Sequence, residues 1–285
     1  MATSGQCGGL FGLYRVKRGR CFDENISGNA TTVQPTRSYI IWFSQRTGST
    51  LLCKALESTG IAGRPGEWLW DPETFDLCTS YGVRNMEEVR EKLWERGSTS
   101  NGVCAVKFGM FEPHHSLLLE QFRQLPGSPT APKRPAVAWE RMYPNCRHLF
   151  MTRRNKVRLA VSWRKAFLSQ QWHLARGEDA SAPDLAGEYD RDNIQSLVIE
   201  ATLREAAIAE IFVENDIVPL TIAYEDFISD FDGTVRKIIE FLGIPVPGDL
   251  DIDAPRLEKL ADDLSEQWVQ RFRDDVQQGW QNRGW

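Results

Sequence analysis

One short polar segment carries the residue types that bind phosphate. It runs Ser44-Gln45-Arg46-Thr47-Gly48-Ser49-Thr50, between an apolar run and a segment with helical periodicity. A helix N-terminus offers unpaired N–H groups and the positive end of the helix dipole, and a glycine there lets the backbone approach an anion. Arg46 adds a positive charge and the hydroxyls of Ser49 and Thr50 add donors. The segment therefore predicts a phosphate-binding turn, with an ordinary turn capped by Ser49 as the alternative.

This segment is not the P-loop of nucleoside triphosphatases. That motif, GxxxxGK[ST], requires a leading glycine and a lysine before the hydroxyl residue, and both are missing here. An ATP-dependent phosphotransferase is therefore disfavoured.

A second basic segment runs from Arg153 to Lys165, with six Lys or Arg residues and no acid among its thirteen. Such a charge run often marks only a solvated helix face. Here, however, Arg153 and Arg154 directly follow a predicted strand, at the sheet edge where α/β folds bind ligands. Two anion sites on one edge predict a ligand with two separated phosphate groups.

The elements expected around these segments alternate between strands and helices. Short apolar runs predict strands at residues 39–43, 103–107, 148–152 and 218–222. Helical periodicity predicts helices at residues 49–58, 86–96, 155–173, 193–215, 234–242 and 256–274. This alternation indicates an α/β fold, with a parallel sheet that carries helices on both faces.

The chain is expected to form one domain, from residue 38 to residue 285. Residues 1–37 are rich in Gly, Ser, Thr and Asn without periodicity, and we interpret them as an extension that is partly disordered or folded onto the domain surface. Residues 126–135 contain four prolines and residues 176–190 are acidic and rich in Gly and Ala. Both segments are predicted to be surface loops, and loops at 126–144 and 176–190 are expected to help bind the acceptor substrate.

Composition excludes several function classes. The 285 residues carry 39 Asp and Glu against 34 Lys and Arg, a net charge of −5, which disfavours nucleic acid and anionic membranes as partners. No apolar run approaches the roughly 18 residues of a transmembrane helix, and the N-terminal residues lack the pattern of a signal peptide, so we expect a cytoplasmic protein. Six scattered cysteines without a CxxC pair predict neither a metal site nor a disulfide framework.

Together these motifs resemble the PAPS-dependent sulfotransferases and, within them, the trehalose 2-sulfotransferase family. The matching segments are residues 44–52, 59–63, 65–67, 153–162, 224–226 and 267–272, which occur in family order over residues 38–275. The resemblance implies the single-domain sulfotransferase fold, in which a P-loop-like central parallel sheet is flanked by helices. It also suggests a homodimer.

The resemblance further implies that 3′-phosphoadenosine 5′-phosphosulfate (PAPS) is the sulfuryl donor, without a metal. The turn would hold the 5′-phosphosulfate through Gln45, Arg46, Thr47, Gly48, Ser49 and Thr50. Either Arg153 or Arg154, together with Ser162, would hold the 3′-phosphate. Tyr224, Trp268 and Arg271 are weaker candidates for contacts with the adenine and the 3′-phosphate, and packing at a strand end explains Tyr224 equally well.

Glu67 falls where this family carries its general base. A sugar hydroxyl is a poor nucleophile, so a carboxylate must take its proton as the sulfuryl group arrives in line. Cations must also stabilise charge on the departing phosphate. Arg46 is the first candidate for that role. Lys107, at the end of a predicted strand, is the second.

The resemblance implies a small carbohydrate, glycan or glycolipid as acceptor. At position 64 this chain has Arg where the family shows an acid, and Arg prefers anionic partners. This departure weakens trehalose as the acceptor and favours an anionic or larger one. Trp68 and Trp70 would form an apolar platform for a sugar ring or a lipid, or else pack in the core or at a dimer interface.

A nucleotide-binding protein that has lost catalysis is the main rival to a sulfotransferase. The presence of Glu67, Arg46 and Lys107 speaks against it, since a pure binder needs no base beside the sulfate.

Overall fold

The computed structural model describes residues 34–71, 73–128, 134–172, 183–252 and 262–281. The chain divides into two compact units, Met1–Thr31 and Thr32–Trp285, and every described residue belongs to the second. Most of the extension predicted for residues 1–37 lies outside the described residues. Arg37, which that prediction placed in the extension, is the first residue of a strand.

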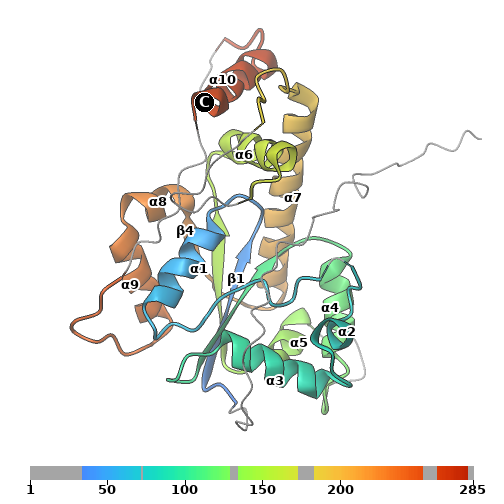
Figure 1. The fold of residues 1–285 in the computed structure, drawn as a ribbon, viewed down its shortest axis with the longest axis vertical. Coiled ribbons are helices and arrows are strands. Elements are labelled where there is room, and N and C mark those ends of the chain that lie inside the picture. The colour runs from blue at the N-terminus through green and yellow to red at the C-terminus, as the bar shows by residue number, and fades with distance from the viewer. Residues whose placement is uncertain (1–33, 72, 129–133, 173–182, 253–261, 282–285) are drawn as a thin grey trace, which may run out of the picture. The chain divides into compact units, whose positions relative to one another are not determined.

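A four-stranded parallel sheet lies at the centre of the second unit (Figure 1). Its strands are β1 (Arg37–Phe43), β2 (Val103–Gly109), β3 (Cys146–Thr152) and β4 (Leu220–Ala223), in the order β2-β1-β3-β4. The parallel sheet predicted from the sequence is confirmed. Strand β4 begins two residues later than predicted, because Val218 is 86% exposed and precedes the strand.

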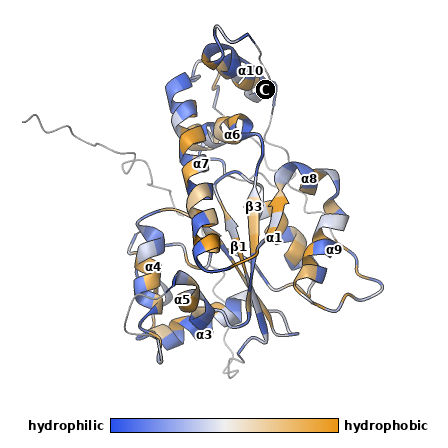
Figure 2. Cartoon of the chain, turned by 180° about the vertical axis from the view of Figure 1, so that it is seen from behind, coloured by the Kyte–Doolittle hydropathy of each residue, from blue (hydrophilic) through white to orange (hydrophobic). Residues whose placement is uncertain are grey.

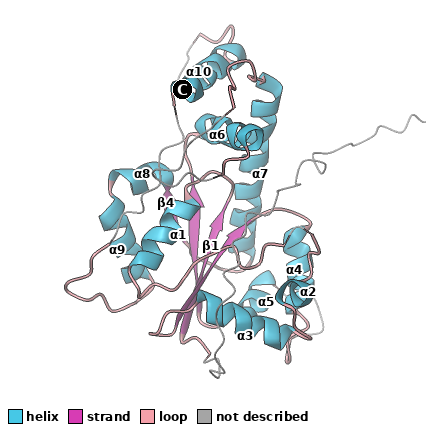
Figure 3. Cartoon of the chain, in the orientation of Figure 1, coloured by secondary structure: helices cyan, strands magenta, loops and turns pink. Residues whose placement is uncertain are grey.

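Both faces of the sheet are covered by helices (Figure 3). On one face lie α2 (Leu77–Tyr81), α3 (Met86–Gly97), α4 (His114–Phe122), α5 (Pro135–Met142) and the C-terminal half of α7 (Arg191–Glu214). On the other lie α1 (Ser49–Ser58), α8 (Tyr224–Ser229) and α9 (Phe231–Phe241). Burial on both faces explains the continuous apolar runs within the strands, such as residues 39–43 of β1 and 149–151 of β3 (Figure 2), which do not alternate with polar residues.

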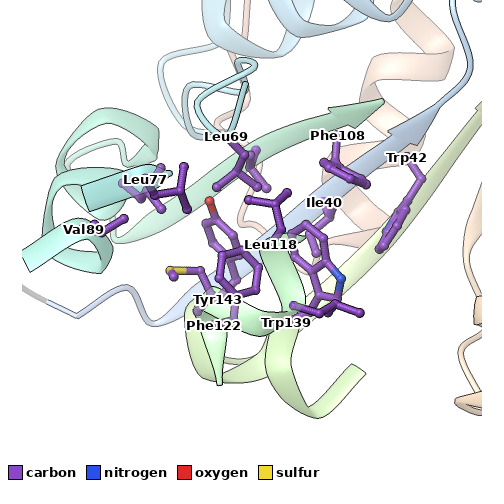
Figure 4. Close-up of a cluster of buried hydrophobic side chains, with 14 of the residues drawn as sticks. Ile40, Trp42, Leu69, Leu77, Val89, Phe108, Leu118, Phe122, Trp139 and Tyr143 are labelled. Carbon is purple, nitrogen blue, oxygen red and sulfur yellow. The ribbon is translucent and has the colours of Figure 1, made fainter. Parts of the chain in front are cut away.

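Alternate residues of β1 enter the two core clusters. Ile40 and Trp42 face the first, where they meet Phe108, Leu118 and Trp139 (Figure 4). The intervening apolar residues of the strand face the second cluster. This alternation is the period of two expected of a strand, and it leaves the carboxyl end of β1 directed at the turn that begins with Ser44.

A third core cluster lies beyond the carboxyl ends of the strands (Figure 1). It is formed mainly by α6 (Lys156–Ser169), the N-terminal half of α7 and α10 (Asp263–Val276). Helix α7 contributes Ile194 and Ala201 to this cluster, and Ile208 and Phe212 to the first. One helix therefore joins the sheet to the helices at its edge.

The predicted helix α1 matches the structure, whereas other boundaries differ. Helix α6 ends at Ser169 and not at residue 173, because Gln170 adopts a left-handed conformation (φ 58°). Helix α10 starts at Asp263, and residues 256–261 of its predicted N-terminal part lie outside the described residues. The helices α2, α4, α5 and α8 were not predicted.

Helix α5 corrects the prediction of an acceptor-binding loop at residues 126–144. It begins at Pro135, because proline is well tolerated in the first turn of a helix, where its missing N–H has no partner to lose. Trp139 anchors the helix in the core. Residues 129–133 and 176–182 of the two predicted loops lie outside the described residues, and residues 183–190 form a loop as predicted.

Two buried histidines of the first face are held as neutral rings. His148 Nδ1 accepts a hydrogen bond of 2.9 Å from Trp42 Nε1, and His114 Nε2 donates one of 3.0 Å to the carbonyl oxygen of Leu69. Burial lowers the pKa of each ring to about 4. Protonation would therefore have to overcome the loss of hydration in the core.

We predict that acid destabilises this fold as the pH falls from about 6.5 toward 4. Over that range the unfolded histidines bind protons that the folded ones do not, so each contributes about 1–3 kcal/mol of stability that is present above pH 6.5 and lost on acidification. Urea unfolding measured across this range should show the loss. The His148→Gln variant, which keeps an acceptor for Trp42, should show a shallower slope. An unchanged slope in that variant would contradict the assignment.

Candidate active site

The turn between β1 and α1 is built on two left-handed residues, Arg46 (φ 63°) and Gly48 (φ 85°). The buried Thr47 closes the turn by donating a hydrogen bond of 3.0 Å from Oγ1 to the carbonyl oxygen of Ser44. Gly48 is the N-cap of α1, and no side chain caps the helix there. The alternative of an ordinary turn capped by Ser49 is therefore wrong. An N-terminus without a capping side chain suits the binding of an anion.

Tyr224 packs against this turn and against the second basic segment. A Cβ atom on Gly48 would lie 2.6 Å from Cδ2 of Tyr224. The guanidinium carbon of Arg153 lies 4.7 Å from the centre of the same ring. Tyr224 is the first residue of α8, directly after β4, so the end of a third strand joins the two segments predicted to bind phosphate.

The turn and the basic segment bring two arginines together. Arg46 Nε donates a hydrogen bond of 3.0 Å to Ser162 Oγ, and Arg153 Nη1 lies 3.4 Å from the carbonyl oxygen of Arg46. Burial and the nearby Arg153 lower the pKa of Arg46 to about 10, and burial lowers the pKa of Arg153. The buried Nε of Arg153 has no hydrogen-bond partner among the described residues. Partly buried cations in this arrangement favour a bound anion.

The other basic residues of the segment are neutralised. Five of its six Lys and Arg side chains form ion pairs, namely Arg154 with Asp226, Lys156 with Glu205, Arg158 with Glu266, Arg164 with Asp190 and Lys165 with Asp262. Within the described ranges, Arg153 is the member that has no carboxylate within 4.0 Å. The positive charge that the segment offers a ligand is therefore concentrated at Arg153.

This distribution separates Arg153 from Arg154. Arg154 is exposed, and both ends of its guanidinium bond the carboxylate of Asp226 at 2.5 Å. Arg153 instead lies between the ring of Tyr224 and the backbone of Arg46, next to the side chain that contacts Ser162. Of the two alternatives that the sequence leaves open, the geometry favours Arg153.

Glu67, Lys107 and Thr50 form a second polar group at the other side of the turn. Lys107 Nζ lies 3.1 Å from Glu67 Oε1 and donates a hydrogen bond of 2.9 Å to Thr50 Oγ1. The lysine side chain is 7% exposed and the glutamate 47% exposed. A carboxylate open to solvent, a buried ammonium and the first turn of α1 therefore meet at one place.

Backbone contacts carry Glu67 to this position. The N–H of Lys107 donates to the carbonyl oxygen of Gly66 at 2.9 Å, so the segment before Glu67 lies along the end of β2. Gly63, three residues earlier, has a φ of 72°, and a Cβ there would lie 2.9 Å from that of Ala105. The segment can follow β2 this closely only with glycine at residue 63.

Arg64 has a structural role. Its guanidinium donates to the carbonyl oxygens of Ser98 and Glu95, at 3.0 and 2.8 Å, where α3 ends. Cationic side chains stabilise a helix C-terminus in this way. The inference of an anionic acceptor from Arg64 therefore finds no support in its contacts.

The two tryptophans after Glu67 also have structural contacts. Trp68 Nε1 donates to the carbonyl oxygen of Arg64 at 2.9 Å, and the ring packs against the first core cluster. Trp70 is half-buried and meets Phe111 and His114 edge-on, with ring centres 5.1 and 5.2 Å apart. Of the two roles predicted for Trp68, packing in the core therefore fits its contacts.

Trp268 and Arg271 have their contacts at α10. Trp268 is buried in the third core cluster and meets the ring of Tyr189 at 6.2 Å. Arg271 is exposed and lies 4.0 Å from the centre of the Tyr189 ring, whose hydroxyl bonds Asp275. The structure places both residues on the helices beyond the strand ends, and their contacts there hold α10 in place.

Two residues of α7 that sequence reasoning missed contact the turn. Arg204 Nη1 donates to Gln45 Oε1 at 2.5 Å, and Glu205 Oε1 accepts from Ser44 Oγ at 3.0 Å. Helical periodicity is the sequence signal that could have identified Arg204. Arg204 lies three residues after the buried Ala201 and four before the buried Ile208, so it occupies a core-facing position of the helix.

Comparisons with known proteins identify the family of this chain. The family model described as Stf0 sulphotransferase matches residues 38–275. The chain belongs to the Stf0 sulphotransferase family. Two relatives are named trehalose 2-sulfotransferase. The one from Mycolicibacterium smegmatis is 25% identical over 264 residues and the one from Mycobacterium tuberculosis 27% over 274, each match covering 84% of this chain and 96% of the relative.

Two solved structures of sulfotransferases also resemble the chain. The sulfotransferase from Alicyclobacillus acidocaldarius is 17% identical, with a TM-score of 0.45 and coverage of 84% of this chain and 92% of that one. The sulfotransferase domain of the Synechococcus PCC 7002 olefin synthase is 13% identical, with a TM-score of 0.37 and coverage of 86% and 91%.

The family implies a donor nucleotide that carries the sulfonate group. The residues that could hold it are those of the turn, Arg153 and Ser162. Among the described residues no group of three or more His, Cys, Asp or Glu side chains could hold a metal ion. The same part of the chain contains no helix with the length and apolar character needed to cross a membrane.

We predict that Gly48→Ala damages this sulfotransferase more than Gly60→Ala does. Both glycines have a positive φ, 85° and 67°, but a Cβ at residue 60 meets nothing within 4 Å, whereas at residue 48 it would collide with Tyr224. Backbone strain alone costs about 1–2 kcal/mol, so Gly60→Ala should lower the melting temperature by a few degrees. Gly48→Ala should lower it further, as measured by calorimetry. Equal losses would contradict the contact with Tyr224.

Proposed function

We propose that this sulfotransferase moves the sulfuryl group of PAPS directly to a hydroxyl of a carbohydrate or glycolipid acceptor. The observation that carries the proposal is the pair Arg46 and Arg153. The partly buried guanidinium of Arg46 contacts Ser162, and that of Arg153 lies against the backbone of Arg46. The Nε of Arg153 has no hydrogen-bond partner within the described residues. Phosphate is the anion for which such a fork of N–H donors is suited.

The donor would occupy two neighbouring phosphate positions. Arg153, Ser162 and the side chain of Arg46 would hold the 3′-phosphate. The N-terminus of α1, with Gly48, Ser49 and Thr50, would hold the 5′-phosphosulfate. Support for two positions comes from the strand order, because Lys107 lies on β2 and Arg153 follows β3, and these strands flank β1 on opposite sides.

Gln45 and Thr47 would act within the turn, since both side chains are engaged by protein groups. Tyr224 would support both positions through its contacts with Gly48 and Arg153. Adenine contacts from Trp268 and Arg271 stay predictions of the family resemblance.

Glu67 would act as the general base. As the acceptor oxygen forms its bond to sulfur, its proton passes to a carboxylate oxygen of Glu67. The bond between sulfur and the bridging oxygen breaks, and its electron pair stays on the 5′-phosphate. The exposure of Glu67 supports this role, because an acceptor hydroxyl can reach the carboxylate from solvent.

Lys107 would stabilise the charge that develops on the departing phosphate. Its ammonium contacts both Glu67 and the Thr50 hydroxyl at the start of α1, where the 5′-phosphosulfate is proposed to bind. The Arg46 side chain is turned to Ser162, so the contacts favour Lys107 over Arg46 for this step. Arg46 would contribute its positive charge from the 3′-phosphate side.

The acceptor is proposed from the relatives. Both curated relatives are named for trehalose, and a carbohydrate hydroxyl is the nucleophile for which a carboxylate base is needed. The contact between Glu67 and Lys107 speaks against a nucleotide-binding protein without catalysis. The homodimer and the cytoplasmic location stay predictions.

Calorimetric titration with 3′-phosphoadenosine 5′-phosphate, the desulfated donor, tests the proposal. We predict binding at micromolar concentration and much weaker binding of ATP. Arg153→Gln should weaken the bisphosphate by at least about tenfold, since it removes a charge-assisted pair to phosphate. Arg154→Gln, in which only the exposed pair with Asp226 is lost, should change affinity less than about twofold.

Preference for ATP, or no binding by a folded protein, would refute the donor assignment. A larger effect of Arg154→Gln than of Arg153→Gln would reverse the assignment of the two arginines.

We predict that Glu67→Gln abolishes sulfuryl transfer and leaves bisphosphate binding within about twofold of wild type. The amide keeps the shape of the side chain but cannot accept the proton. Transfer would be followed with labelled PAPS and a panel of sugars and glycolipids, by mass spectrometry. Glu57→Gln is the matched control, because Glu57 also pairs with a lysine, Lys54, at 3.0 Å, but on the exposed surface of α1. Turnover in Glu67→Gln close to that of Glu57→Gln would exclude Glu67 as the base.

A further inference from the structure

Glu205 lies in the middle of α7 and joins the two segments that hold the arginines. Its Oε1 accepts a hydrogen bond of 3.0 Å from Ser44 Oγ. Its Oε2 accepts bonds of 2.7 Å from Thr152 Oγ1 and 2.6 Å from Lys156 Nζ. The carboxylate is 14% exposed, and both of its oxygens are therefore engaged in a largely buried place.

These partners stand next to the residues proposed to bind phosphate. Ser44 opens the turn, two residues before Arg46, and Thr152 directly precedes Arg153. Lys156 Nζ also donates to the carbonyl oxygen of Arg153 at 2.6 Å. Each arginine is thus within two residues of a group that Glu205 holds.

The Glu205 carboxylate bridges β1 and β3 just beyond the last paired residues of the two strands. The parallel pairing of β1 with β3 ends at Phe43 opposite Met151. The next two residues, Ser44 and Thr152, are the ones that Glu205 bridges, one with each oxygen. The register of the two strands is therefore continued by one side chain into the turn and into the start of α6.

We propose that Glu205 is a positioning residue that sets the spacing between the two phosphate positions of the donor. This role rests on the proposed donor, and Glu205 acts through Ser44, Thr152 and Lys156 without touching the nucleotide. A bare carboxylate beside an anion site would repel the ligand. Lys156 neutralises the charge of Glu205 through their ion pair. The carboxylate therefore positions the two segments without repelling the anionic ligand.

A ligand with two phosphates senses this spacing, whereas a ligand with one does not. The test therefore compares 3′-phosphoadenosine 5′-phosphate with adenosine 5′-phosphate by calorimetric titration. In Glu205→Gln the ion pair with Lys156 is lost. The amide nitrogen only donates, so it cannot accept the bond from Ser44 Oγ or, in the other rotamer, the bonds from Thr152 and Lys156. We expect the affinity for the bisphosphate to fall at least about tenfold and that for the monophosphate less than about threefold.

Asp262→Asn is the matched control. Asp262 pairs with Lys165, another lysine of α6, at the same 2.6 Å, but this pair connects α6 with α10. The control should lower the melting temperature as Glu205→Gln does, and leave the ratio of the two affinities unchanged. Should Glu205→Gln fail to fold, Thr152→Val removes one of the three bonds with little change of shape. Thr152→Val should lower the ratio of bisphosphate affinity to monophosphate affinity by at least about threefold.

The outcomes separate the two proposals. A wild-type protein that does not prefer the bisphosphate would refute the proposed donor, and the role of Glu205 with it. A wild-type preference that Glu205→Gln leaves unchanged, or a loss that is equal for the two nucleotides, would overturn the positioning role alone.

Discussion

The arrangement of the site depends on one electrostatic constraint, the placement of Arg46 and Arg153 together in a partly buried place. Burial lowers the pKa of each guanidinium because it removes the water that would hydrate the charge, and the nearby Arg153 lowers the pKa of Arg46 further, to about 10. Arg46 therefore remains charged near neutral pH. Arg46 also holds a left-handed backbone conformation, which costs energy in a residue other than glycine. A bound anion, such as the proposed donor, would offset both costs at this place.

The rest of the fold holds this pair in place from three directions. The parallel sheet brings the ends of β1, β3 and β4 to one edge, and thereby places Arg46, Arg153 and Tyr224 side by side. Helix α6 supplies Ser162 and neutralises its other cations by ion pairs, so that the positive charge is local. Helix α7 joins the sheet core to the helices beyond its edge, and its polar residues contact the turn between these two apolar halves. Helix α7 thus contributes both to the core and to the proposed donor site.

Local patterns were sufficient to predict much of this structure. The apolar runs predicted all four strands, because strands buried on both faces are continuous in composition, and the turn was predicted from Gly48 and its neighbours. What local patterns could not show were contacts between distant segments. The choice between Arg153 and Arg154 depends on Asp226, which lies on α8, and the role of Arg64 depends on carbonyl groups at the end of α3. Glu205 is 161 residues from Ser44 and 53 from Thr152 in the sequence. Helix α5 was missed because the four prolines of residues 126–135 suggested a loop, although the last of them starts the helix.

The central claim is that one donor molecule bridges the arginine pair and the N-terminus of α1. The most direct measurement is a crystal structure of the protein with 3′-phosphoadenosine 5′-phosphate. The account predicts the 3′-phosphate within hydrogen-bonding distance of Arg153 and Ser162, and the 5′-phosphate at the backbone N–H groups that follow Gly48, close to Lys107. A nucleotide bound with neither phosphate at Arg153, or with the N-terminus of α1 unoccupied, would contradict it.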